Sequence, residues 1–350
     1  MRILVTGNMG YVGPGVVRRL RESHPQAEIV GFDAGYFAHC LTNAASLPER
    51  VLDRQIFGDI RSIAPSLLEG FDAVVNLAAI SNDVMGAIDE SLTMDVNCDS
   101  GVRLAEMAKQ AGARSFVFAS SCSVYGSEGE GAKTEAADLD PLTAYARSKI
   151  ATEKALKPLA GDGFNVTCLR FGTACGMSDR LRLDLVLNDF VACAVASKKI
   201  TVLSDGSPWR PLIHVLDMAR AIDWAVGRDA KDGGAFLVCN TGSDAWNYQV
   251  RELAEAVARE IPGTEVEINR EAPPDNRSYR VDFAYYRRLA PQHQPQVDLD
   301  TAVKDLRAGL AGMRFSNGSF RDSELMRIKA LTGHRDAGRL TPDLRWTARR

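Results

Sequence analysis

Short apolar runs rich in valine and isoleucine alternate with segments of helical periodicity through the first half of the chain. Each run is bounded by glycine, serine, asparagine or aspartate, a pattern typical of strands that are buried on both faces. Helical periodicity covers residues 16–20 and residues 95–111. This alternation predicts an α/β fold with a doubly wound parallel sheet. The predicted strands are residues 2–6, 28–32, 55–58, 71–79, 115–119 and 165–170.

The first predicted strand runs into a glycine-rich turn that opens the first helix. Gly7, Gly10 and Gly13 are spaced Gly-x-x-Gly-x-x-Gly, which differs from the commonest dinucleotide fingerprint, and an ordinary turn is the alternative. The second strand ends at Asp33, however, and an acid at this place binds the adenosine ribose hydroxyls and repels a 2′-phosphate. Because Ala34 follows rather than an arginine, the sequence predicts a dinucleotide site that prefers NAD to NADP.

A tyrosine and a lysine four positions apart, Tyr145 and Lys149, fall in a predicted helix over residues 144–159. At this spacing both side chains lie on one face of the helix. A nearby cation stabilises a tyrosine phenolate, although such pairs also occur by chance on solvent-exposed helices. The position of the pair favours chemistry, because the carboxyl ends of parallel strands meet at one edge of a sheet. Residues expected at this edge are Gly7, Asp33, Ala78, Ser121 and Tyr145.

The composition is that of an ordinary globular protein, with 350 residues, 45% hydrophobic and 25% charged. A formal net charge of -3 argues against nucleic acid as the main partner. Seven cysteines without CxxC spacing favour reduced thiols and a cytoplasmic location. We expect no metal cofactor. We also expect no membrane partner, because no apolar run reaches the ~18 residues of a span and no signal segment precedes the first strand.

The alternation ends in the second half, where loops and scattered positive charges become frequent. An apolar run at residues 235–240 is expected to return the chain to the main sheet. The predicted architecture is a Rossmann sheet with a smaller C-terminal substrate-binding lobe. The expected division is residues 1–171 with a return segment at about 212–246 for NAD, residues 172–211 and 247–330 for substrate, and residues 331–350 as a tail.

Taken together, these motifs resemble the extended short-chain dehydrogenase/reductase superfamily, and within it the nucleotide-sugar epimerases and dehydratases. The resemblance covers nearly the whole chain. It implies a cofactor site, a catalytic Ser/Thr and a Tyr-x-x-x-Lys pair. Asn97 is assigned to the cofactor site, although a polar residue on a helix face is an equally good interpretation. The implied cofactor residues are Gly7, Gly10, Tyr11, Val12, Gly13, Asp33, Asp59, Ile60, Leu77, Ala78, Ala79, Asn97, Tyr145 and Lys149.

The resemblance also implies roles for the catalytic residues. Tyr145 would remove the proton of a sugar hydroxyl while the same carbon gives hydride to the nicotinamide. Lys149 would lower the pKa of the tyrosine and hold the nicotinamide ribose, and Ser121 would orient the reacting oxygen. The partner implied is a nucleotide-diphosphate sugar, with an arginine on its diphosphate. Implied substrate residues are Ser81, Asn82, Ser123, Thr173, Arg182, Asn188, Arg210 and Arg277, where a solvated surface charge is the alternative for each arginine.

Departures from the family pattern narrow the function. Cys122 and Ser123 occupy the positions where the dehydratases carry an acid, so dehydration is disfavoured. Thr173 and Cys175 also differ from many epimerases, so the sugar is not identified. The leading hypothesis is an NAD-dependent epimerase that forms a transient ketone and returns the hydride to it. The alternatives are a nucleotide-sugar dehydrogenase or ketoreductase and, from another class, a non-catalytic dinucleotide sensor. The resemblance further suggests a homodimer that pairs residues 95–111 and 144–159.

Overall fold

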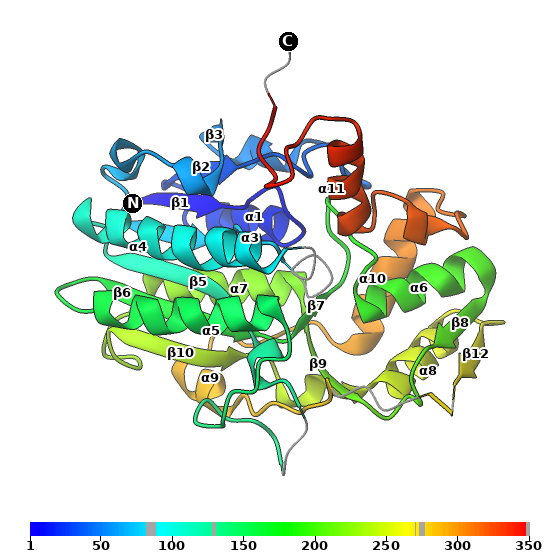
Figure 1. Ribbon diagram of the computed structural model, residues 1–350. Helices are drawn as coiled ribbons and strands as arrows, with labels where there is room; N and C mark the ends of the chain where they lie inside the picture. The colour runs from blue at the N-terminus through cyan, green and yellow to red at the C-terminus, as the bar shows by residue number, and fades with distance from the viewer. Residues whose placement is uncertain (82–88, 128–130, 270, 273–276, 348–350) are drawn as a thin grey trace.

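The computed structural model describes residues 1–81, 89–127, 131–269, 271–272 and 277–347. Its centre is a parallel sheet of seven strands in the order β10-β6-β5-β4-β1-β2-β3, which confirms the predicted fold class (Figure 1). The order reverses at β1, so the carboxyl ends of β1 and β4 flank the place where such sheets bind ligands. The strands are β1 (Arg2–Thr6), β2 (Glu28–Asp33), β3 (Arg54–Phe57), β4 (Ala73–Asn76), β5 (Ser115–Ser121), β6 (Asn165–Phe171) and β10 (Phe236–Thr241).

The fourth strand is shorter than the run predicted for residues 71–79. The backbone amide of Leu77 still donates to the carbonyl of Thr6 over 3.0 Å, but the chain then leaves the sheet. Leu77, Ala78 and Ala79 therefore lie beyond the strand, at the open edge of the sheet.

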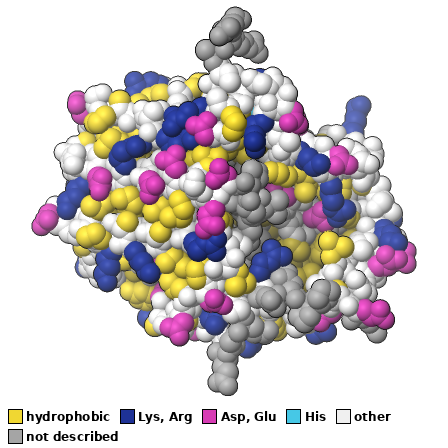
Figure 2. Space-filling view, viewed as in Figure 1, with side chains coloured by type: hydrophobic (Ala, Val, Ile, Leu, Met, Phe, Trp, Pro, Cys, Tyr) yellow, Lys and Arg dark blue, Asp and Glu magenta, His cyan; other side chains and the backbone are white. Residues whose placement is uncertain are grey.

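Helices cover both faces of the sheet because successive strand residues are apolar on both sides. Ile3 and Val5 pack on one face against α1 (Gly13–Ser23) and α7 (Val215–Gly227), whereas Leu4 packs on the other face. That other face is covered by α4 (Ser100–Gln110) and α5 (Ala144–Leu156). A π-helical turn, η4 (Asp95–Asp99), joins α3 (Glu90–Met94) to α4. Figure 2 shows hydrophobic side chains gathered between and over α4 and α5 on the outer surface.

A second group of elements lies beside the sheet, to the right in Figure 1, around a core of its own. It contains a three-stranded sheet in the order β11-β9-β7 and a parallel pair of β8 with β12. Between β9 and β11 in sequence, the chain returns to the large sheet, where β10 pairs with β6. The elements are β7 (Thr173–Cys175), α6 (Val186–Ser197), β8 (Lys199–Val202), β9 (Trp209–His214), β11 (Asn247–Gln249), α8 (Val250–Glu260), β12 (Glu265–Ile268) and α10 (Leu299–Gly312).

The last part of the described chain returns to the open edge of the large sheet. After α9 (Ala284–Leu289) and α10, the chain forms α11 (Arg327–Asp336) and a turn closed by the bridge between Leu340 and Trp346. Figure 1 shows this red segment to the right of β1, β2 and β3. Within the ranges given above, no helix combines the length and apolar character required to cross a membrane.

Candidate active site

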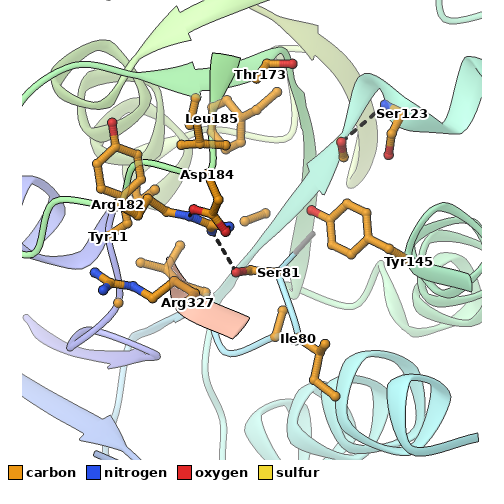
Figure 3. A pocket seen from close by; sticks show the side chains of 18 of the residues that line it. Tyr11, Ile80, Ser81, Ser123, Tyr145, Thr173, Arg182, Asp184, Leu185 and Arg327 are labelled. Carbon is orange, nitrogen blue, oxygen red and sulfur yellow. Dashed lines mark hydrogen bonds and ion pairs between the residues drawn. The ribbon is translucent and has the colours of Figure 1, made fainter. Parts of the chain in front are cut away.

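The open edge of the sheet and the second group of elements enclose one cavity of about 760 Å³ (Figure 3). Its size falls within the range of small-molecule sites. The cavity brings together the predicted residues from Gly7 to Arg277, which are far apart in sequence. Predicted residues on its wall are Gly7, Gly10, Tyr11, Val12, Gly13, Asp33, Asp59, Ile60, Leu77, Ala78, Ala79, Ser81, Ser121, Ser123, Tyr145, Lys149, Thr173, Arg182, Arg210 and Arg277.

The glycine turn forms a cradle that larger residues would fill. Gly7 has a φ of 73°, and an added Cβ would lie 2.5 Å from the backbone nitrogen of Ala78. A Cβ on Gly13 would lie 1.9 Å from the carbonyl oxygen of Asn8. Helix α1 begins here with no side-chain cap at Val12 and no acidic residue in its first turn. Its positive end therefore remains available to an anion, which fits the diphosphate of NAD.

Asp33 is held at the end of β2 by the glycine turn. Its carboxylate accepts hydrogen bonds from the backbone amides of Met9 (2.9 Å) and Gly35 (2.7 Å). Burial raises the pKa of Asp33, and these two hydrogen bonds partly oppose the effect. The carboxylate is thus oriented before any ligand binds, which suits an acceptor for ribose hydroxyls.

Asp59, predicted to contact adenine, is already engaged by a guanidinium. Arg61 donates to the Asp59 carboxylate from Nε (3.0 Å) and from a terminal nitrogen (2.6 Å). The side chain of Arg61 is almost fully buried. Asp59 therefore lines the cavity as half of an ion pair, and its contact with adenine remains a prediction.

Tyr145 and Lys149 lie on the first two turns of α5. Thr143 caps this helix by accepting from the amide of Ala146 over 3.1 Å, so the helix begins just before Tyr145. The Lys149 ammonium is buried, donates to the carbonyl of Ala119 over 2.7 Å and lies 5.3 Å from the centre of the Tyr145 ring. Burial lowers the pKa of Lys149 to about 8, and the charge of Glu153 opposes this only in part.

Two serines at the end of β5 lie beside the tyrosine. The Ser121 hydroxyl accepts from the backbone amide of Ser123 over 3.2 Å, which leaves its own hydrogen to donate. The Ser123 hydroxyl is buried and has no hydrogen-bond partner among the residues described. Figure 3 shows Tyr145 directed into the cavity on the same side as Ser123. The arrangement offers two hydroxyl groups and a phenol to one small polar ligand.

The opposite wall carries an ion pair. Arg182 donates to both carboxylate oxygens of Asp184, over 2.7 and 2.8 Å, and to the hydroxyl of Ser81 over 3.0 Å. Burial acts to raise the pKa of Asp184, but the Arg182 guanidinium outweighs this effect, and the pKa of the carboxyl lies below its ordinary value. Asp184 was not predicted, because residues 181–185 form an irregular segment with no period that would place its side chain beside that of Arg182. Thr173 begins β7 nearby.

Two predicted ligand residues are absent from the cavity lining and form hydrogen bonds with other parts of the protein. Asn97, in η4, exchanges hydrogen bonds with the backbone of Ile80 over 2.8 and 3.1 Å. Asn188 donates to the hydroxyl of Tyr11 and the carbonyl of Arg182, both over 2.9 Å. Both side chains are buried and position cavity residues. Asn82 lies outside the described residues.

The two remaining arginines predicted for the substrate also line the cavity. Arg210, in β9, donates to the carbonyl of Trp209 over 2.9 Å, and Arg277 is exposed. Both contribute to the wall of the cavity, so a diphosphate partner remains the prediction for them.

One group of potential metal ligands occurs in the described part of the chain, away from the catalytic residues. The ligand atoms of His39, Cys40 and Glu324 lie within 4.8 Å of one another. Two of the three residues are exposed. Sequence spacing gave no indication of this group, because Glu324 joins it only through the fold.

The comparisons with known proteins agree with this geometry. Residues 3–239 match the family described as the NAD dependent epimerase/dehydratase family. UDP-glucose 4-epimerase of Streptomyces lividans is 28% identical over 275 residues, which are 74% of this chain and 80% of the relative. dTDP-glucose 4,6-dehydratase of Streptomyces griseus is 28% identical over 302 residues, 85% of this chain and 90% of the relative. A solved structure of MoeE5 with UDP-glucuronic acid and NAD is 25% identical, with a TM-score of 0.74 over 89% of this chain and 99% of the other.

Proposed function

The chain belongs to the NAD dependent epimerase/dehydratase family, and on that premise we propose that it is a nucleotide-sugar epimerase that retains its NAD. The observation that carries the proposal is the placement of Tyr145, Lys149 and Ser121 in one cavity with the glycine cradle and Asp33. Bound NAD supplies the acceptor and the donor of hydride at one carbon of the sugar. The relatives named above act on nucleotide sugars by name, which supports this substrate class.

The residues of the cavity divide the remaining work. Tyr145 takes the proton of the sugar hydroxyl as its carbon is oxidised and returns it when that carbon is reduced. Lys149 lies close enough to favour the phenolate form of Tyr145. Ser121 donates its free hydrogen to the reacting oxygen and thereby orients it. Ser123 and Thr173 are proposed to hold other sugar hydroxyls.

Among the described residues, the two candidates for a general acid at the catalytic centre are poorly suited to that role. This favours epimerisation over dehydration. The Cys122 thiol is buried and donates to the carbonyl of Arg170, and burial raises its pKa. Asp184 is paired with Arg182 across the cavity. A dehydratase requires a group that gives a proton to the departing hydroxyl. The Cys122 thiol is a weaker acid than usual, and Asp184 is held in its ionised form, so neither residue suits that role.

The second group of elements is proposed to bind the nucleotide. Residues within 172–211 and 247–330 contribute to the cavity wall, including Arg210 and Arg277. A planar guanidinium suits the two oxygens that a phosphate presents, so these arginines are proposed partners of the diphosphate.

The proposal is tested by the cofactor balance of the reaction. Protein purified without added cofactor is unfolded, and the released nicotinamide and nucleotide sugar are identified by mass spectrometry. The native protein is then incubated with a panel of nucleotide sugars, and products are read by NMR. We expect near-stoichiometric NAD and conversion of one sugar to its epimer without added cofactor.

The Tyr145→Phe variant is the matched control. It should contain as much NAD as the wild-type protein and lose at least roughly 10²-fold in turnover, because the base is absent. If every consumed sugar required one equivalent of added cofactor, the protein would instead be a dehydrogenase or ketoreductase. Full activity of the variant would exclude Tyr145 as the base.

A further inference from the structure

The C-terminal turn, residues 340–347, reaches the end of the cavity where the adenosine of NAD belongs. Asp33 and the Asp59–Ile60 segment mark that end, since Asp33 is the last residue of β2 and the segment follows β3. Leu344 lines the cavity together with these residues and Tyr36. The turn lies outside the range matched by the family, so the match assigns it no role.

The backbone of the turn is bound to the ion pair predicted to meet adenine. Arg61, which forms an ion pair with Asp59, also donates to the carbonyl of Asp343 over 2.7 Å and to the carbonyl of Leu344 over 3.3 Å. The hydroxyl of Tyr36 donates to the same carbonyl of Leu344. Arg61 therefore connects the adenosine end of the cavity to the C-terminal turn.

A second anchor joins the turn to the loop that follows Asp33. The indole nitrogen of Trp346 donates to the carbonyl of Ala34 over 2.5 Å. The Trp346 ring lies 5.8 Å from the ring of Tyr36 and 5.1 Å from that of His334, measured between ring centres. The turn thus spans from β3 to the loop after β2.

The side chain of Leu344 is held inward at a conformational cost. Its φ is 58°, in the left-handed region that bulky residues rarely adopt. Leu344 is buried with Ile80, Leu92 and Leu331 in one apolar cluster. Strain of this kind persists only where surrounding contacts enforce it, and here those contacts place an apolar side chain on the cavity wall.

We propose that residues 340–347 form the outer wall of the adenosine end of the NAD site and slow the dissociation of NAD. The proposal rests on the NAD binding of the proposed function and is independent of the reaction. NAD that is regenerated in each turnover has no need to leave, so a wall that retains it suits an epimerase.

The test compares dissociation rates in three variants. One lacks residues 340–350, and one is Trp346→Ala. The matched control is Lys329→Ala on the exposed side of α11, where Lys329 pairs with the surface residue Asp322. Each protein is loaded with NAD, and its release is followed by stopped-flow as excess NADH, which is fluorescent, takes its place. We expect release to accelerate at least tenfold in the truncated protein, to a smaller extent in Trp346→Ala, and not at all in Lys329→Ala.

ADP-ribose, which lacks the nicotinamide, locates the effect. Its dissociation should accelerate by the same factor as that of NAD, because the wall contacts only the adenosine half. Unchanged rates in both variants would overturn the inference, as would an effect on NAD that ADP-ribose does not share. Thermal melting without NAD shows which variants are folded, and Trp346→Ala carries the test if the truncated chain is not.

The outcome is separable from the fate of the proposed function. If the wild-type protein is purified without NAD but the variants still release added NAD faster, the epimerase proposal is wrong and the inference about residues 340–347 is confirmed. If NAD is retained equally by all variants, the wall fails and the epimerase proposal stands.

Discussion

Lys149 is a buried cation that lies beside the ring of Tyr145. Its ammonium has the carbonyl of Ala119 at 2.7 Å and the rings of Phe118 and Tyr145 at 4.7 and 5.3 Å. Burial lowers its pKa to about 8, below the value of an unfolded chain. The unfolded state therefore binds more protons between pH 8 and about 10.4, and the free energy of unfolding rises with pH across that interval.

This dependence should disappear in the Lys149→Met variant. Removing the buried charge relieves a penalty on the order of 3 kcal/mol at pH 7, offset by about 1 kcal/mol for the lost hydrogen bond. We expect a variant that is more stable than the wild type at pH 7 and catalytically inactive. Urea unfolding of the NAD-free protein from pH 7 to pH 10 measures the free energy of unfolding. The Lys154→Met variant, changed at an exposed position, is the control. A wild-type stability that does not rise above pH 8 would contradict the assignment.

At the scale of elements, the π-helical turn η4 aligns the helices around the site. The turn directs Asn97 inward, where it binds the backbone of Ile80 and donates to the hydroxyl of Ser148 on α5 over 3.0 Å. The hydroxyl of Thr152, one turn later on α5, donates to the carbonyl of Asn97 over 3.3 Å. One side chain thus ties the segment after β4 to the helix that carries Tyr145.

Asn97→Ala should loosen this junction. The substitution leaves the buried amide and carbonyl of Ile80 without partners, which we expect to cost roughly 3 kcal/mol of the free energy of unfolding. Turnover should also fall, because α5 loses its alignment with the cavity. Denaturant unfolding and activity assays compare it with Asp99→Ala, an exposed position in the same turn. Equal stability of the two variants would show that the network is dispensable.

At the scale of the whole molecule, α4 and α5 present the surface on which the predicted homodimer depends. Hydrophobic side chains gather on this face in Figure 2. Ala151 is half-buried on α5, so a long charged side chain at that position would separate two paired copies.

Light scattering measures the assembly directly. The wild-type protein should have twice the mass of one chain, and Ala151→Arg should shift it toward the monomer. Ala308→Arg, at an exposed position on α10 away from this face, should leave the mass unchanged. A monomeric wild-type protein would rule out the dimer.

Sequence alone determined the features that depend on local geometry. Strand and helix periods, the glycine turn, Asp33 at a strand end and the four-residue spacing of Tyr145 and Lys149 are all readable because backbone sterics act over a few residues. These features were sufficient to predict the parallel sheet and the family. They also predicted which strand ends share one edge, and the structure brings Gly7, Asp33 and Tyr145 to one cavity there.

Only the tertiary structure decided which groups already have partners. Asp59 is bound by Arg61, and Asn188 donates to Tyr11 and Arg182, so both side chains already have partners within the protein. Leu344 reaches the carboxyl edge of β2 and β3 from the far end of the chain. Contacts of this kind arise from packing between distant segments, and no local period or spacing encodes which distant segment will fill a given gap.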